Sequence, residues 1–352
     1  MSFRTPGGLP SWMMGPPVLE EELFEAAREG DPDAYRGLVE RHGAELHAHC
    51  YRMLGSLHDA EDALQEALLR AWRGLPRLSR QRSLKNWLYR IATNVCLDFL
   101  ARRRARVLPI DDGRSTDPAD HGEPLADGNW IEPYPDGELD DGYAAPEARY
   151  EQREAVELAF VAALQHLPAR QRAVLILREV LGFSAREVAG TMDTTVASVN
   201  SSLQRARATV DRRLPEHSQQ ATVRSLGNRR VRRLVERFSD AFEHGDVDTI
   251  LSMLADDATF AMPPYAGWSR GRQAIAASWL MPSLPPAKLR YLHSSANAQP
   301  ALAAYHWNDE QRGYLPITLD VLSFRGHEIA GVVAFRTPGL FERFGLPSAL
   351  PS

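Results

Sequence analysis

Apolar side chains recur at helical spacing through residues 20–107, with polar side chains between them. Gly30 and Pro32 interrupt the first part of this pattern, so we expect separate helices on either side of them. Longer helices are predicted at 57–72 and 84–104, where several apolar residues fall on one face. The region is therefore predicted to form an all-α unit.

Residues 151–214 show a second run of helical spacing that ends in a long basic helix. Ser184 and Glu187 have the spacing of a capping box and predict the start of a short helix. After a turn, Thr195 is placed to cap the final helix. A short helix, a tight turn and a long helix predict a helix-turn-helix, although a purely structural three-helix bundle has the same pattern.

The last part of the chain changes from helical spacing to the alternation typical of strands. Three helices come first, and the expected strands are residues 289–293, 301–307, 314–324 and 328–335. Helices followed by a curved antiparallel sheet predict an α+β domain. The chain is thus expected to be multidomain, with all-α domains at 20–107 and 151–214, a linker at 108–150 and an α+β domain at 222–348.

The composition is that of a globular protein, with 44% apolar and 25% charged residues among 352. No apolar run approaches the ~20 residues that span a bilayer, and the N-terminus lacks the apolar core of a signal peptide. Cys50 and Cys96 are too few for a disulfide scaffold or a structural zinc site. We expect a cytoplasmic protein with no metal site, no cofactor and no membrane contact.

The net charge of −5 averages over very uneven segments. Residues 101–107 hold four arginines and no acid, whereas residues 108–150 hold twelve acids and two arginines among many prolines and glycines. More arginines follow between 205 and 213. This alternation predicts an extended acidic linker between two basic units that bind nucleic acid.

One face of the predicted 57–72 helix is acidic and partly apolar. Asp62, Gln65, Glu66 and Leu69 follow one another there at i, i+3, i+4 and i+7. An apolar side chain among acids favours a docking surface, and the alternative is an ordinary solvated face.

The predicted 84–104 helix carries an aromatic ring, an amide and several bases along one face. These residues are Trp87, Arg90, Asn94, Arg102, Arg103 and Arg104. Such a face suits single-stranded DNA, because the ring stacks on a base, the amide bonds a base edge and the arginines hold phosphates. The alternative for Trp87 is a place in the core.

The final helix of the helix-turn-helix is predicted to enter the major groove of DNA. Its residues expected near base edges are Ala197, Ser198, Asn200 and Ser201. Arg205 and Arg207 are expected to reach phosphates.

The linker holds three apolar residues among its acids, Trp130, Ile131 and Tyr134. Spacers favour small polar residues, so these are predicted to be docking anchors, either on a partner protein or on the C-terminal domain. The tail at 340–350 contains Phe341 and is a candidate for the matching contact; the alternative is that it closes its own domain.

The stretches 59–73 and 86–106 resemble regions 2.2 to 2.4 of extracytoplasmic-function (ECF) sigma factors, and 167–210 resembles their region 4. The resemblance implies a promoter-specificity subunit of bacterial RNA polymerase. In the family, region 2 docks on the clamp helices of the largest subunit and melts the −10 element. Region 4 binds the −35 element and the flap of the second-largest subunit.

The resemblance also assigns residues. It makes the polymerase active-site channel the partner surface expected for Trp130, Ile131 and Tyr134, with the C-terminal domain as the alternative. The acidic patch matches the docking helix, and Trp87, Arg90 and Asn94 match the helix that faces the melted −10 strand. Where many members have a Lys-Ser-Arg run, this chain has serines after Asn200, which makes an ordinary −35 preference doubtful.

Residues 242–275 resemble the SnoaL-like, nuclear-transport-factor-like cone fold. Enzymes of that fold use a carboxylate or histidine in the cone as general base, and the candidates here are Asp256, Asp257, His293 and His306. We expect an in-chain regulator of a non-enzymatic sigma factor, with an isomerase- or cyclase-like or ligand-sensing domain as the alternative. A small ligand or an anti-sigma factor is a further possible partner.

Overall fold

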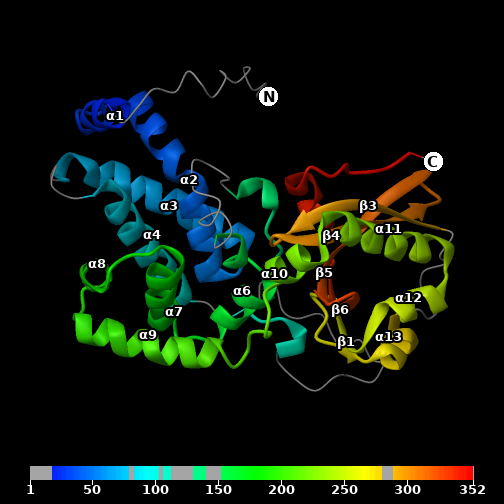
Figure 1. The fold of residues 1–352 in the computed structure, drawn as a ribbon. Helices are drawn as coiled ribbons and strands as arrows, with labels where there is room; N and C mark the ends of the chain where they lie inside the picture. The colour runs from blue at the N-terminus through cyan, green and yellow to red at the C-terminus, as the bar shows by residue number, and fades with distance from the viewer. Residues whose placement is uncertain are drawn as a thin grey trace.

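The computed structural model describes residues 18–78, 83–102, 106–111, 130–139, 152–279 and 288–351. Helical units occupy one side of the molecule and a sheet covered by helices occupies the other, with the linker segment between them (Figure 1). Within the described residues, no helix is long and apolar enough to cross a bilayer.

The first unit is helical, as the spacing predicts. It consists of α1 (Val18–Arg28), α2 (Pro32–Leu54), α3 (Leu57–Gly74), the short turn η2 (Leu75–Arg77) and α4 (Leu84–Leu100). The buried face of α3 is made of alanines, which lets α2 and α4 pack closely against it. The helix expected to reach residue 104 ends at Leu100, so that boundary was wrong.

The second unit contains the predicted helix-turn-helix. Its helices are α6 (Leu158–Gln165), α7 (Ala169–Leu175), α8 (Ala185–Thr191) and α9 (Val196–Val210). The Ser184–Glu187 capping box and the Thr195 cap are both confirmed. Helix α7 continues into a π-helical turn, η5 (Ile176–Val180).

The C-terminal domain has the expected helices and strands. The helices are α10 (Gln219–Leu226), α11 (Asn228–His244), α12 (Val247–Met253) and α13 (Arg272–Trp279). The strands are β1 (Leu254–Ala261), β2 (Trp268–Arg270), β3 (Leu289–Ala296), β4 (Gln299–Asn308), β5 (Gly313–Arg325) and β6 (Glu328–Phe335). A last turn, η7 (Pro338–Phe344), follows the sheet.

The sheet order is β2-β1-β6-β5-β4-β3. The expectation of a wholly antiparallel sheet was wrong, because β1 pairs with β6 in parallel. The sequence pattern also missed β1, since helix α12 runs directly into it and its apolar residues extend the helical pattern. Asp256 and Asp257, two of the general-base candidates, lie within this strand.

The two faces of the sheet belong to different cores. Leu302, Leu322 and Phe324 pack with α11 and α12 on one face. Tyr305 and Phe335 on the opposite face join a continuous cluster that extends through the linker into both helical units. The alternation of the strands therefore serves two interfaces, and the C-terminal domain shares a core with the rest of the protein.

Candidate nucleic-acid and docking interfaces

The acidic face of α3 is accessible. Leu69 is 51% exposed and is surrounded by polar groups. Asp62 lies within 3.9 Å of His58, and Glu66 accepts a 2.7 Å hydrogen bond from Arg70. Gln65, also exposed, borders a cavity of ≈ 550 Å³ beside the linker. An exposed leucine rimmed by acids fits a docking surface.

The candidate −10 face of α4 is only partly open. Trp87 is half-buried and packs against the cluster formed by α1, α2 and η2, so the core alternative accounts for part of its surface. A Cβ placed on Gly74 would lie 3.0 Å from the Trp87 ring, which explains the glycine there. Asn94 and Arg102 are exposed, whereas Arg103 and Arg104 lie outside the described residues.

The same face of α4 contacts the helix-turn-helix. Arg90 donates to both carboxylate oxygens of Asp193, at 3.0 Å each, and Asp193 lies in the turn between α8 and α9. Asn86 donates to Glu187 of α8 at 2.8 Å. The predicted −10 surface is therefore partly covered by the domain predicted to bind the −35 element.

The recognition helix α9 presents its predicted DNA face to solvent. Ala197, Ser198, Asn200, Ser201 and Arg205 are all exposed. The Arg205 guanidinium donates to the Ser201 hydroxyl at 2.8 Å. Arg207, expected to reach a phosphate, is exposed and forms a 2.7 Å ion pair with Glu179 of the π-helical turn in the free protein.

Part of the linker is docked rather than extended. Ile131 and Tyr134 are fully buried, and Trp130 is half-buried. The described segment 130–139 therefore corrects the expectation of a solvated spacer over its whole length. Ile131 and Tyr134 join the core cluster shared by the helical units and the C-terminal domain, so these two side chains are docked inside this protein.

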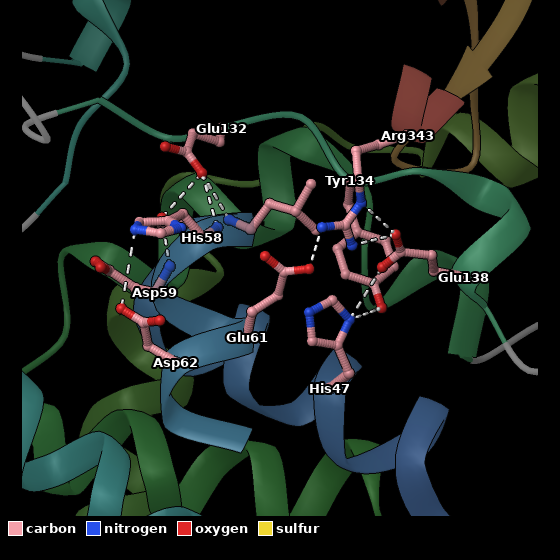
Figure 2. Close-up of polar contacts among 11 residues, drawn as sticks. His47, His58, Asp59, Glu61, Asp62, Glu132, Tyr134, Glu138 and Arg343 are labelled. Atoms are coloured by element: carbon pink, nitrogen blue, oxygen red, sulfur yellow. Dashed lines mark hydrogen bonds and ion pairs between the residues drawn. The ribbon is translucent and has the colours of Figure 1, made fainter. Parts of the chain in front are cut away.

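Glu132 of the linker caps a helix of the first unit. Its Oε2 accepts hydrogen bonds from the Ser56 hydroxyl at 2.9 Å and from the backbone N–H groups of Leu57 and His58 (Figure 2). A carboxylate at a helix N-terminus is favoured by the helix dipole. The cap joins the linker to the start of α3, the helix predicted to carry the docking surface.

The turn between β3 and β4 contacts the first unit, the linker and the second unit. The Asn297 side-chain amide donates to the Tyr51 hydroxyl of α2 and to the backbone carbonyl of Val156, both at 2.8 Å. Its oxygen accepts from the backbone N–H of Tyr134 at 2.9 Å. A fully buried amide with these partners fixes the first unit, the second unit and the linker relative to one another.

The C-terminal domain and the second unit also cap each other's helices. Gln299 of β4 accepts from the N–H of Leu158, the first residue of α6. Glu157 in turn accepts from the N–H groups of Gln219 and Gln220 at the start of α10. Burial raises the pKa of Glu157 to about 7, and the two N–H donors only partly offset this rise.

A charged network joins the tail to α3 (Figure 2). Arg343 of η7 hydrogen-bonds Glu138 of the linker, at 2.5 Å from one Nη atom, and also contacts Glu61 of α3. His47 of α2 lies 3.1 Å from Glu138. Burial alone would raise the pKa of Glu138, but the hydrogen bonds from His47 and Arg343 outweigh it and lower that pKa.

The tail closes its own domain and makes this outside contact as well. Phe341 is buried and packs edge-on against Tyr305 of β4. The tail therefore closes its own domain through Phe341 and contacts the linker and α3 through Arg343.

The predicted catalytic candidates do not converge. Asp256 pairs with Arg272 at 3.1 Å, and Asp257 pairs with Arg325, all near the surface. His293 is exposed and hydrogen-bonds Ser239, and His306 lies nearer the far end of β4.

One buried carboxylate of the cone was missed. Asp320 is 3% exposed on the helix-covered face of β5, and burial raises its pKa to about 7. The sequence did contain a sign of this buried carboxylate, because Asp320 interrupts the apolar run of β5.

Comparison with known proteins decides the family. Residues 38–106 match the family described as Sigma-70 region 2, residues 157–210 match Sigma-70, region 4, and residues 235–336 match the SnoaL-like domain. The ECF RNA polymerase sigma factor SigG of Mycobacterium tuberculosis is 42% identical over 326 residues, which cover 92% of this chain and 86% of the relative. The chain belongs to the ECF sigma factors.

Two further comparisons extend this result. The ECF RNA polymerase sigma-E factor of Escherichia coli is 28% identical over 57% of this sigma factor and 97% of its own length. The crystal structure of Mycobacterium tuberculosis SigJ, an extracytoplasmic function sigma factor, has a TM-score of 0.54 at 21% identity. It covers 87% of this chain and 96% of that one, so the resemblance in fold includes the C-terminal domain.

The family gives the function in outline. This sigma factor binds RNA polymerase and promoter DNA to start transcription, and membership implies a regulator rather than an enzyme. The resemblance drawn from residues 59–73, 86–106 and 167–210 is confirmed, as is the SnoaL-like character of the C-terminal domain.

Proposed function

We propose that the C-terminal domain is an in-chain regulator that holds the two DNA-binding domains of this cytoplasmic sigma factor in a closed arrangement. The observation that carries the proposal is the Asn297 amide, which bonds α2, the linker and the residues before α6 at once. In this account the C-terminal domain has no catalytic role.

Three surfaces bind polymerase or promoter DNA once the two DNA-binding domains separate. The patch of Asp62, Gln65, Glu66 and Leu69 docks on the clamp helices of the largest polymerase subunit. Asn94 and the arginines at the end of α4 hold the melted −10 strand, while Trp87 offers its exposed part. Helix α9 enters the −35 major groove, and its domain contacts the flap of the second-largest subunit.

The closed arrangement competes with promoter binding at a definite place. Arg90 belongs to the proposed −10 face, yet its guanidinium is bound to Asp193 in the helix-turn-helix. The −10 and −35 elements are separate DNA segments, so the two domains must part before both elements are bound. An exposed ion pair contributes only about 0–1 kcal/mol, so this contact alone presents a small barrier.

The buried contacts of the C-terminal domain supply the larger part of that barrier. A buried hydrogen bond contributes about 1 kcal/mol, and one left without its partner costs about 1–3 kcal/mol. Asn297 makes three such bonds, and opening breaks those to Tyr51 of the first unit and Tyr134 of the linker while exposing Ile131 and Tyr134. Polymerase shifts the equilibrium between the closed and open forms only to the extent that it binds the open form more tightly than the closed form.

Run-off transcription with core polymerase tests the proposal. The full-length Asn297→Ala variant is compared with wild type and with Asn308→Ala, which changes the same residue type at the other end of β4. We expect more transcript from Asn297→Ala at limiting polymerase and unchanged yield from the control. Equal yields from wild type and Asn297→Ala, with the variant folded, contradict the regulatory role.

A further inference from the structure

The surface between α10 and α11 is an arginine-lined groove that none of the assigned functions uses. Its volume is ≈ 1060 Å³. The arginines that line it are Arg224, Arg229, Arg230, Arg233 and Arg237. All five side chains are exposed, and no acidic side chain lines the groove.

Three of the five arginines of the groove are unpaired within the described residues. In the described part of the chain, Arg229, Arg230 and Arg233 make no hydrogen bond or ion pair through their side chains. Most other arginines near this domain are paired, as Arg272, Arg290 and Arg325 are. The described residues therefore leave the positive field of these three guanidinium groups available to an anionic ligand.

Helix stability does not explain this arrangement. Arg229, Arg233 and Arg237 are spaced four residues apart on one stripe of α11, where like charges repel each other. Arg229 and Arg230 lie in the first turn, where the helix dipole favours acids, and that end has no side-chain cap. A charge pattern that destabilises its own helix and gains no stabilising contact within the described residues indicates a binding surface.

The groove is fixed to the DNA-binding domain. Glu157, at the start of α6, accepts hydrogen bonds from the first two N–H groups of α10, and Ser218 donates to Glu154 at 2.6 Å. Only residues 211–218 separate α9 from α10. The arginines are therefore carried by the same rigid unit as the recognition helix.

We propose that this groove binds the phosphate backbone of promoter duplex DNA next to the segment that α9 contacts. Guanidinium groups bind phosphate oxygens in pairs of hydrogen bonds, which suits a lining whose charged residues are all arginines. The contact would add affinity without base preference, and so offset the weak phosphate contacts expected from the serines after Asn200. The inference rests on the proposed −35 role of α9.

The test measures the salt dependence of promoter binding by full-length sigma factor assembled with core polymerase. The groove variant is Arg233→Gln. The matched control is Arg232→Gln, the neighbouring exposed arginine of α11, which does not line the groove. Two DNA fragments are used, one ending just outside the −35 element and one extended further upstream.

Arg233→Gln is expected to lower the slope of log affinity against log salt by about one on the extended fragment, because one phosphate contact is lost. Arg232→Gln should behave as wild type, and the short fragment should not distinguish the proteins. Equal slopes for the two variants overturn the inference, as does a loss of polymerase affinity in Arg233→Gln alone, which would make the groove a protein-binding surface. Failure of wild type to bind either fragment would count against the −35 role itself.

Discussion

The side-chain amide of Asn297 donates a 2.8 Å hydrogen bond to the hydroxyl of Tyr51, which lies 246 residues earlier in the chain. Tyr51 is fully buried in α2 and also donates to the Glu132 carbonyl of the linker. The C-terminal domain thus reaches the core of the first DNA-binding domain through one buried polar group. Breaking that contact is expected to loosen the closed form.

Charge reversal on the docking helix should weaken polymerase binding. Asp62→Lys with Glu66→Lys replaces the acids around Leu69 by bases, so the affinity for core polymerase should fall at least tenfold, equivalent to about 1.4 kcal/mol. Equilibrium binding to labelled polymerase measures the change. The control is Asp248→Lys with Glu310→Lys, which makes the same charge change on the C-terminal domain; matching affinities for the two double variants refute the docking surface.

Asn94→Ala should impair promoter melting more than duplex binding. Holding an unstacked base must offset a cost of a few kcal/mol, and the exposed Asn94 amide is proposed to contribute a base contact. Permanganate reactivity of the −10 thymines should fall while polymerase–promoter affinity changes little. A wild-type footprint would exclude this role for Asn94.

Arg205→Ala should weaken −35 binding evenly across sequences. The side chain is exposed on α9, and a lost phosphate contact lowers the salt slope by about one. Arg207→Ala is the comparison, because Arg207 is paired with Glu179. A change of base preference in Arg205→Ala would show that it contacts bases instead.

The closed form should lose stability as pH rises through neutrality. The pKa of Glu157 is raised to about 7, so folding favours its protonated form. Its contribution is full below the ordinary pKa of 4.5 and is lost as pH rises through 7, by at most about 3 kcal/mol.

Urea unfolding between pH 5 and 8 measures this dependence. Glu157→Gln cannot ionise and should give a flatter profile than wild type. Glu154→Gln, which changes a neighbouring acid bonded to Ser218, should keep the wild-type slope. Identical slopes in all three proteins would show that Glu157 does not titrate in this range.

Local chemistry predicted the elements better than their assembly. The cap at Thr195 and the box at Ser184 depend on residues three positions apart, so the sequence contains all of their determinants. The linker anchors Ile131 and Tyr134 were identifiable because large apolar side chains among acids are costly to expose.

Contacts between distant segments were not predictable in this way. Asn297 lies in a two-residue turn with positive φ, and its sequence context indicates a turn but none of its partners. Asp256 and Asp257 follow apolar residues whose spacing fits either the preceding helix or a strand, and only pairing with β6 and β2 decides the matter. Arg343 gave no sign of its ion pairs, because both partners are far away in sequence.

The distance between the two DNA-binding domains tests the central claim most directly. Spin labels at exposed Arg77 of η2 and exposed Gln204 of α9 report that distance in the full-length protein by pulsed electron resonance. We predict one short distance in free wild type, a longer one when core polymerase is bound, and a mixture of both in free Asn297→Ala. A broad, long distribution in free wild type that Asn297→Ala leaves unchanged would contradict the claim that the C-terminal domain holds the sigma factor closed.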